Sequence, residues 1–183
     1  MSSVTVLLAA HRNGDPAALD ELATLVYPEL KRMAHGRARP RSGSSATTLV
    51  NETFLKLLSG GDIVSEDRKQ FFALAATIMR RIIVDEIRYL TAGKRKGNKE
   101  TLAETIIGDD AHEKAEFLLQ VDQMLDILEQ QDARLARVFE CRYFAGLTTA
   151  ETAEALDASE RSVERLWASA RTRIADLMEA SSQ

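Results

Sequence analysis

The side chains of this sequence that could carry out chemistry are few and scattered. His11, His35 and His112 stand far apart, and Cys141 is the single cysteine. No group of histidines or carboxylates has the spacing of a metal site or of an acid–base pair. A lone cysteine can form neither an internal disulfide nor a cysteine-built zinc site, and it fits a reducing cytoplasm. The sequence therefore predicts a protein without enzyme activity, metal or cofactor.

Charged groups are the next candidates, and they divide unevenly along the chain. Residues 1–99 contain 16 Lys+Arg and 10 Asp+Glu, whereas residues 100–183 contain 8 Lys+Arg and 18 Asp+Glu. This asymmetry indicates two units with different partners. The acidic total disfavours non-specific nucleic-acid binding, but a local basic face can still bind phosphate.

The elements that position these groups are predicted to be helices throughout. The chain has 183 residues with only three Pro and nine Gly, and apolar residues recur at helical spacing. We expect an all-α protein of two small domains, residues 1–92 and 113–183, joined by a linker at 93–112. Neither a signal peptide nor a membrane span is expected, so the predicted location is the cytoplasm. The predicted helices cover residues 4–12, 16–37, 48–58, 69–90, 115–130, 132–144, 149–156 and 160–178.

The helix at residues 46–58 is amphipathic. Val50, Phe54, Leu57 and Leu58 form its apolar side, while polar residues fall on the other side. Several hydroxyl residues before it could cap its first turn.

Near the C-terminus the spacing predicts a helix-turn-helix. Thr148-Thr149-Ala150-Glu151 has the form of a capping box, Asp157 stands in the turn, and Ser159 can cap a longer second helix. The small residue Ala153 suits the crossing of the two helices. Residues that could reach DNA lie at the start of the second helix and further along it: Ser159, Glu160, Arg161, Ser162, Glu164, Arg165 and Arg171, with Arg173 near phosphates.

Three motifs together resemble the extracytoplasmic-function (ECF) sigma factors of bacterial RNA polymerase. The run from Ser45 to Leu55 is similar to the family signature Asp-Ala-Glu-Asp-Leu-Val-Gln-Glu-Thr-Phe-Leu. The run from Met79 to Arg88, after the aromatic Phe71, matches a later signature. The helix-turn-helix matches the C-terminal domain, and the resemblance covers nearly all of residues 4–180.

The resemblance implies roles by position. The helix at 48–58 would dock on the clamp helices of core RNA polymerase through Thr48, Asn51, Glu52, Leu55 and Lys56. The −10 promoter element would be bound by Asp62, Lys69, Arg80, Arg81 and Arg88; an intramolecular or solvated role for the arginines stays open. The residues at 159–171 would read the −35 element, and the second domain would touch the polymerase flap. A Ser/Thr protein kinase or an anti-sigma factor is compatible with this role, but the sequence identifies neither.

One departure from the family pattern concerns charge. The acidic residues before Leu-Val-Gln-Glu are absent, and Ser45, Thr47 and Thr48 stand in their places. Phosphorylation adds about −1.5 to −2 charges, which a helix N-terminus favours. We therefore expect Thr47 or Thr48 to be a phosphorylation site that switches on polymerase binding; plain capping by Ser45 and Thr47 is the alternative. For the whole chain, the alternative is a regulator that binds DNA without polymerase.

Overall fold

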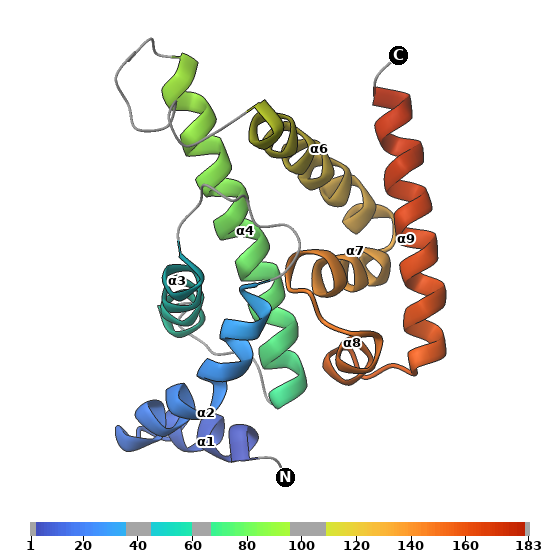
Figure 1. Ribbon diagram of the computed structural model, residues 1–183. Coiled ribbons are helices and arrows are strands. Elements are labelled where there is room, and N and C mark those ends of the chain that lie inside the picture. Colours follow the sequence, from blue (N-terminus) through green and yellow to red (C-terminus); the bar gives the residue numbers. More distant parts are fainter. Residues whose placement is uncertain (1–2, 36–44, 60–66, 96–108, 182–183) are drawn as a thin grey trace.

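The computed structural model describes residues 3–35, 45–59, 67–95 and 109–181, and these are helical apart from their connections (Figure 1). The all-α prediction is confirmed. The long helix α4 runs through the middle of the molecule, with the first three helices on one side and the last four on the other. The elements are α1 Ser3–Arg12, α2 Ala17–Met33, α3 Ala46–Ser59, α4 Arg68–Arg95, α6 Asp109–Gln131, α7 Ala133–Phe139, a π-helical segment η1 Glu140–Phe144, α8 Thr149–Ala155 and α9 Glu160–Ser181.

A hydrophobic core runs without a break from α1 to α9. The apolar side of α4 is its centre, and Phe71, Ala75 and Ile87 are fully buried there. Leu22, Leu30 and Leu8 pack from the N-terminal side, and α6, η1 and α8 pack from the C-terminal side. The helices that belong to the two predicted domains therefore share one core. The domain boundaries themselves stay a prediction.

Several helix limits differ from the expected ones. Helix α4 continues to Arg95 beyond the predicted end at Leu90, and α6 begins at Asp109, six residues before the predicted start. Helix α2 ends at Met33, short of Arg37, which lies outside the described residues. Leu25 has the spacing of the apolar stripe of α2, but its side chain is 44% exposed because it lines the open groove between α1 and α2.

The predicted helix at 132–144 changes its winding halfway. Asp132 caps α7, since its side chain accepts a hydrogen bond from the backbone N–H of Arg134. From Glu140 to Phe144 the backbone is π-helical, and Ala145 N–H bonds to the carbonyl of Glu140 at 3.1 Å. Such wide turns are rare and often lie at functional positions. In this segment Glu140 is buried and faces α4, a placement that the sequence pattern did not predict.

Candidate polymerase-binding and nucleic-acid-binding surfaces

Helix α3 presents one continuous exposed face. The five residues predicted to bind polymerase recur along one side of the helix, each three or four residues from another of the set, and all are exposed: Thr48, Asn51, Glu52, Leu55 and Lys56. Leu55 is 62% exposed at the centre of this face. The opposite face is buried on α4 and α2 through Leu49, Val50 and Leu57. Thr53 is also fully buried there, because its hydroxyl donates to the carbonyl of Leu49 at 2.7 Å and so needs no water.

The first turn of α3 carries hydroxyl groups and no carboxylate. Ser45 Oγ accepts a hydrogen bond from the backbone N–H of Thr48 at 3.1 Å and lies 3.0 Å from Thr48 Oγ1. Ser45 is therefore the cap of this helix. Thr47 and Thr48 are both exposed beside it. The positive end of the helix dipole thus lies next to two accessible hydroxyls.

The predicted −10 residue Arg80 is buried, with only 6% of its side chain exposed. Its guanidinium donates to Asp122 Oδ1 at 2.7 Å, to Asp126 Oδ1 at 2.5 Å and to Glu140 Oε1 at 3.0 Å. A further bond reaches the carbonyl of Asp122 at 3.0 Å. Burial opposes the charge, but the Asp122 carboxylate and these hydrogen bonds outweigh it and raise the pKa of Arg80 above its ordinary value.

The carboxylates around Arg80 have further partners. Arg88 donates to Asp122 Oδ2 at 2.9 Å, and Arg137 approaches Glu140 Oε2 at 3.3 Å. Thr77 donates to the same Glu140 oxygen at 2.7 Å. We call the six charged residues the Arg80 cluster, in which three cations balance three carboxylates: Arg80, Arg88, Arg137, Asp122, Asp126 and Glu140.

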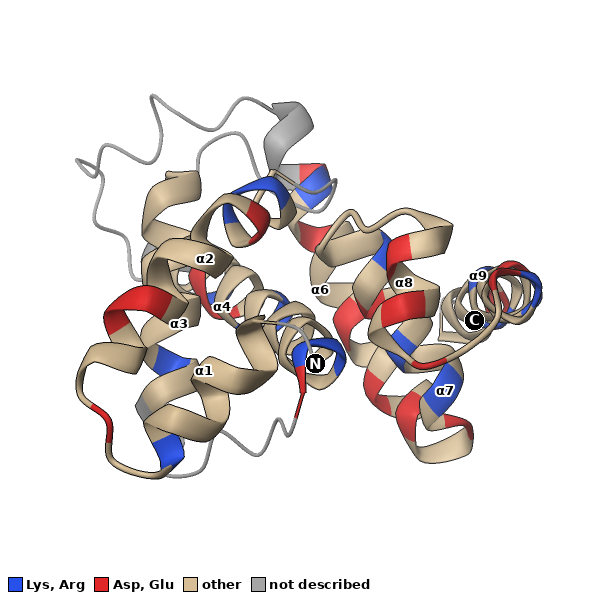
Figure 2. Cartoon of the chain, turned by 90° about the horizontal axis from the view of Figure 1, so that it is seen from below, with Lys and Arg blue, Asp and Glu red and all other residues tan. Residues whose placement is uncertain are grey.

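Three more cations from the N-terminal helices pair with acids of the helix-turn-helix. Lys69 Nζ lies 2.5 Å from Asp157 Oδ1, which lowers the pKa of Asp157 and raises that of Lys69. Arg68 bridges Glu29 and Glu154 at 2.7 and 2.5 Å. Arg32 lies 2.8 Å from Glu151. Viewed from below, acidic segments of α6 and α8 gather on the side of the C-terminal helices that is turned toward α4 (Figure 2).

The remaining predicted −10 residues are not part of these contacts. Arg81 is exposed and forms no ion pair with another described residue. Asp62 lies outside the described residues. Of the predicted −10 cations, the structure therefore joins Lys69, Arg80 and Arg88 to carboxylates and leaves Arg81 at the surface. Sequence analysis missed those carboxylates, although the opposite net charges of the two halves were a signal that they could meet.

Helices α8 and α9 form the predicted helix-turn-helix. Thr148 and Glu151 make the reciprocal bonds of a capping box, and Ser159 accepts from Ser162 N–H at 3.2 Å as the cap of α9. Asp157 has a φ of 51°, so the turn takes the left-handed conformation that Asp can adopt. Ala153 and Val163 are buried where the helices cross, with Leu156 and Leu166 packed beside them.

The start of α9 is open to solvent. The predicted −35 residues are exposed except Ser162, which is partly covered: Ser159, Glu160, Arg161, Glu164, Arg165 and Arg171. Trp167 is close to two arginines, with the Arg142 and Arg171 guanidinium carbons 5.6 and 5.8 Å from its ring centre. These contacts hold Arg171 against an aromatic surface while its charge stays accessible.

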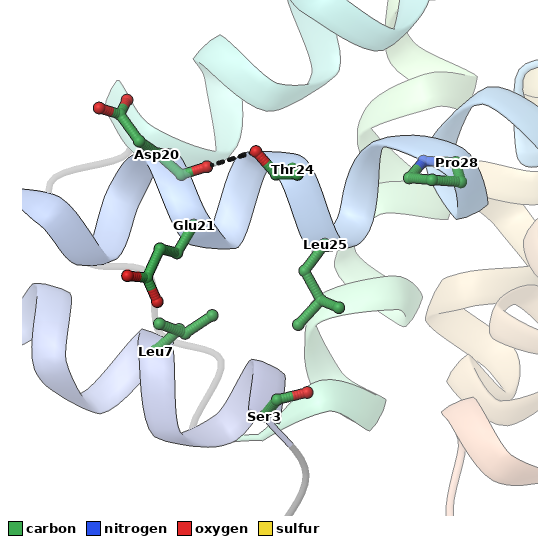
Figure 3. Close-up of a pocket in the computed structure, with 7 residues that line it drawn as sticks. All are labelled: Ser3, Leu7, Asp20, Glu21, Thr24, Leu25 and Pro28. Atoms are coloured by element: carbon green, nitrogen blue, oxygen red, sulfur yellow. Dashed lines mark hydrogen bonds between the residues drawn. The ribbon is translucent and has the colours of Figure 1, made fainter.

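A shallow groove of about 660 Å³ lies between α1 and α2 (Figure 3). Leu7, Leu25 and Pro28 supply its apolar part, and Asp20 and Glu21 stand at one end. Thr24 in the groove donates to the carbonyl of its own helix at Asp20. No set of three His, Cys, Asp or Glu side chains suitable for a metal ion occurs in the described part of the chain. None of the described helices is long and apolar enough to cross a bilayer.

The described chain thus combines an exposed amphipathic helix, α3, with an open helix-turn-helix formed by α8 and α9. The model of the ECF sigma factor family matches residues 1–180, and the chain belongs to that family. No curated protein matches the sequence significantly. A solved structure, CnrH in complex with the cytosolic domain of CnrY, shares 19% identity over 98% of this chain and 99% of that chain, with a TM-score of 0.45. Members of this family direct promoter recognition by RNA polymerase and are not enzymes.

Proposed function

We propose that the exposed face of α3 docks this chain on the clamp helices of core RNA polymerase and that the start of α9 reads the −35 promoter element. The observation that carries this proposal is the exposure of both faces in a chain that belongs to the ECF sigma factor family. On α3, Leu55 supplies an apolar anchor and Glu52 a charge beside it. On α9, Arg161 and Arg165 can donate to guanine edges, and Arg171 can bind phosphate.

Run-off transcription tests this function. Core polymerase with the purified chain should initiate on the promoter upstream of its own gene, whereas core polymerase alone should not. The absence of any chain-dependent transcript, across the promoters of genes that change when the chain is overproduced, would contradict the proposal.

We further propose that docking is conditional on phosphorylation of Thr47 or Thr48. Both hydroxyls are exposed, so a kinase can reach them, and the first turn of α3 contains no acid that could serve instead. A phosphate on Thr48 would lie one helical turn from Glu52 and on the same face as Leu55. Orphan N–H groups and the dipole at the helix start favour the added charge. Together these groups would form the acidic surface that the family signature otherwise supplies.

Substitutions in the first turn of α3 test this switch. Pull-down of core polymerase should rank Thr48→Glu or Thr47→Glu above wild type made without a kinase, and the alanine variants no higher than it. Thr24→Glu is the matched control, because Thr24 is exposed on α2 and bonds only within its own helix. Equal binding by all variants, together with no phosphate on either threonine in protein purified from its native cells, would contradict the proposal that phosphorylation controls docking.

The runner-up function is a regulator that binds DNA by itself. Its supporting observation is that the start of α9 is exposed in the free chain. Gel shifts with and without core polymerase separate the two functions. Specific binding of one DNA sequence by the chain alone would favour the runner-up.

A further inference from the structure

The groove between α1 and α2 is built from groups that the proposed function does not use (Figure 3). Its apolar part contains Leu7, Leu25 and Pro28, and Leu25 is 44% exposed although it has the spacing of a core residue. Asp20 and Glu21 supply carboxylates at one end, and both residues are exposed. A concave surface that combines apolar side chains with a few polar groups is typical of binding sites.

The two carboxylates of the groove have no cationic partner in the described ranges of the chain. Neither Asp20 nor Glu21 forms an ion pair with another described residue. By contrast, Glu29 further along the same helix lies 2.7 Å from a guanidinium nitrogen of Arg68. The charges at the end of the groove are therefore available to a cation of a binding partner.

Pro28 leaves one backbone acceptor of α2 without its helical partner. A proline has no backbone N–H, so Pro28 cannot donate to the carbonyl of Thr24 four residues earlier. Thr24 and Pro28 both line the groove, and both are exposed. The hydroxyl of Thr24 donates to the carbonyl of Asp20 at 2.9 Å. The groove thus adds a neutral acceptor to its two carboxylates, and the N–H groups of Lys and Arg are suitable donors for such acceptors.

The walls of the groove fit a helix better than an extended peptide. Ser3 and Leu7 on α1 are four residues apart, and so are Glu21 and Leu25 on α2, which gives intervals of about 6 Å along both walls. Rows of side chains with this spacing interlock with the side chains of another helix. An extended peptide would instead pair with a sheet edge, and the described residues form no strand.

We propose that the α1–α2 groove is the docking site of a basic amphipathic helix from a partner protein. Leucine-type side chains of that helix fill the apolar part of the groove, and a Lys or Arg pairs with the carboxylates at its end. The groove shares no residue with the exposed face of α3 that the proposed function assigns to polymerase. This inference therefore does not depend on the proposed function, and its test contains neither polymerase nor promoter.

Binding of designed peptides to the full chain tests this inference. The probe is a fluorescein-labelled peptide of about 16 residues, long enough to form a helix, with leucines on one side and lysines beside them. A second peptide has glutamate in place of each lysine. A third has the composition of the first in an order that forms no apolar side. Fluorescence anisotropy should show that the chain binds the first peptide at least about tenfold more tightly than either of the others.

A substitution in the apolar part of the groove shows where the first peptide binds. Leu25→Gln should weaken this binding about tenfold, because a polar side chain of similar size replaces the apolar contact. Leu55→Gln is the matched control, since Leu55 is an exposed leucine of α3 outside the groove. Its affinity for the first peptide should equal that of wild type.

A second variant tests the charges and serves also if Leu25→Gln does not fold. Asp20→Asn/Glu21→Gln should weaken binding of the first peptide about threefold to tenfold at low salt, and less at high salt. Asp176→Asn/Glu179→Gln is the control, with the same change in net charge at exposed positions of α9. Thermal unfolding followed by circular dichroism shows which variants are folded.

Three results would overturn the proposal. The first is equal affinity for the three peptides, or the absence of saturable binding up to about 1 mM peptide. The second is an equal loss of affinity in the groove variants and in their controls. The third is a dimer of the free chain, seen by sedimentation velocity, that Leu25→Gln dissociates, since the groove would then bind a second copy of this chain.

Discussion

Arg80 Nε donates to Asp122 Oδ1 at 2.7 Å, and this bond joins α4 to α6 inside the molecule. Both side chains are less than a tenth exposed. The bond therefore ties the basic N-terminal half to the acidic C-terminal half at a place that water does not reach. Its neighbour Arg81 is exposed, so two adjacent arginines of the same helix have opposite environments.

This contrast predicts a large difference in stability. Arg80→Ala leaves Asp122 and Glu140 buried without their main partner, and removal of one member of a buried charge group costs about 3–5 kcal/mol. Arg81→Ala should change the free energy of unfolding by less than about 0.5 kcal/mol. Urea unfolding followed by circular dichroism measures both. Similar losses in the two variants would show that the Arg80 cluster does not stabilise the folded protein.

A second prediction concerns the exposed apolar anchor of α3. Leu55→Ala should leave the unfolding midpoint near that of wild type and should weaken polymerase binding about tenfold, as loss of a hot-spot side chain does. Leu25→Ala is the control, because Leu25 is also an exposed leucine but lies in the α1–α2 groove. Surface plasmon resonance with immobilised core polymerase gives both affinities. A larger loss of polymerase affinity in Leu25→Ala than in Leu55→Ala would indicate that the groove, and not α3, is the docking face.

The third prediction concerns the −35 surface. Arg165→Ala should lower the affinity for the cognate −35 duplex by about 1–3 kcal/mol and relax the preference at one base pair, because a base contact carries sequence information. Arg134→Ala, an exposed arginine of α7 paired with Asp132, should leave the affinity unchanged. Fluorescence anisotropy on a set of single-base variants of the duplex provides the measurement. A uniform loss over every duplex would instead make Arg165 a phosphate contact.

The fourth prediction concerns the thiol. Burial of Cys141 raises the pKa of its thiol from 9.0 to about 12, with the charge of Glu140 adding to the effect. The native protein at pH 8 should therefore react with a thiol reagent only as fast as it opens. Since the folded pKa is above the unfolded one, the stabilising effect of the neutral thiol is present below pH 9 and is lost as the pH rises toward 12. Cys141→Ala should therefore lose less unfolding free energy than wild type as the pH rises from 9 toward 12. Rapid labelling of the native wild-type protein would contradict the burial of the thiol.

Local patterns in the sequence were sufficient to predict the helices and the helix-turn-helix. The capping residues Thr148 and Ser159 act through bonds within three residues, so their roles follow from spacing alone. The apolar stripe of α4 likewise required only a period of 3.6 residues. Predictions failed where the cause lies far away in sequence. Leu25 has the spacing of the core stripe of α2, but it lines the open groove between α1 and α2 and stays 44% exposed.

The contacts of the predicted −10 cations could not be derived from the sequence for the same reason. Glu140 and Asp122 are 60 and 42 residues from Arg80, and Glu140 faces inward on a π-helical segment that has no known sequence signal here. The structure answers the open question of an intramolecular role for two of the arginines, because Arg80 and Arg88 are both bonded to Asp122. Their role at promoter DNA stays a prediction.

In the ion pairs between the two halves of the described chain, the N-terminal half supplies the cations and the C-terminal half the carboxylates. This division also affects how two copies of the chain can bind each other. Contact between two N-terminal halves would bring cations together, and contact between two C-terminal halves would bring carboxylates together. Identical halves of two molecules therefore repel each other. The complementary half of a second molecule could make the same contacts that each molecule makes within itself. The high effective concentration of the attached half favours the monomer, and exchange between molecules becomes competitive only in concentrated protein. The charge division between the two halves therefore disfavours pairing of the chain with itself in dilute solution.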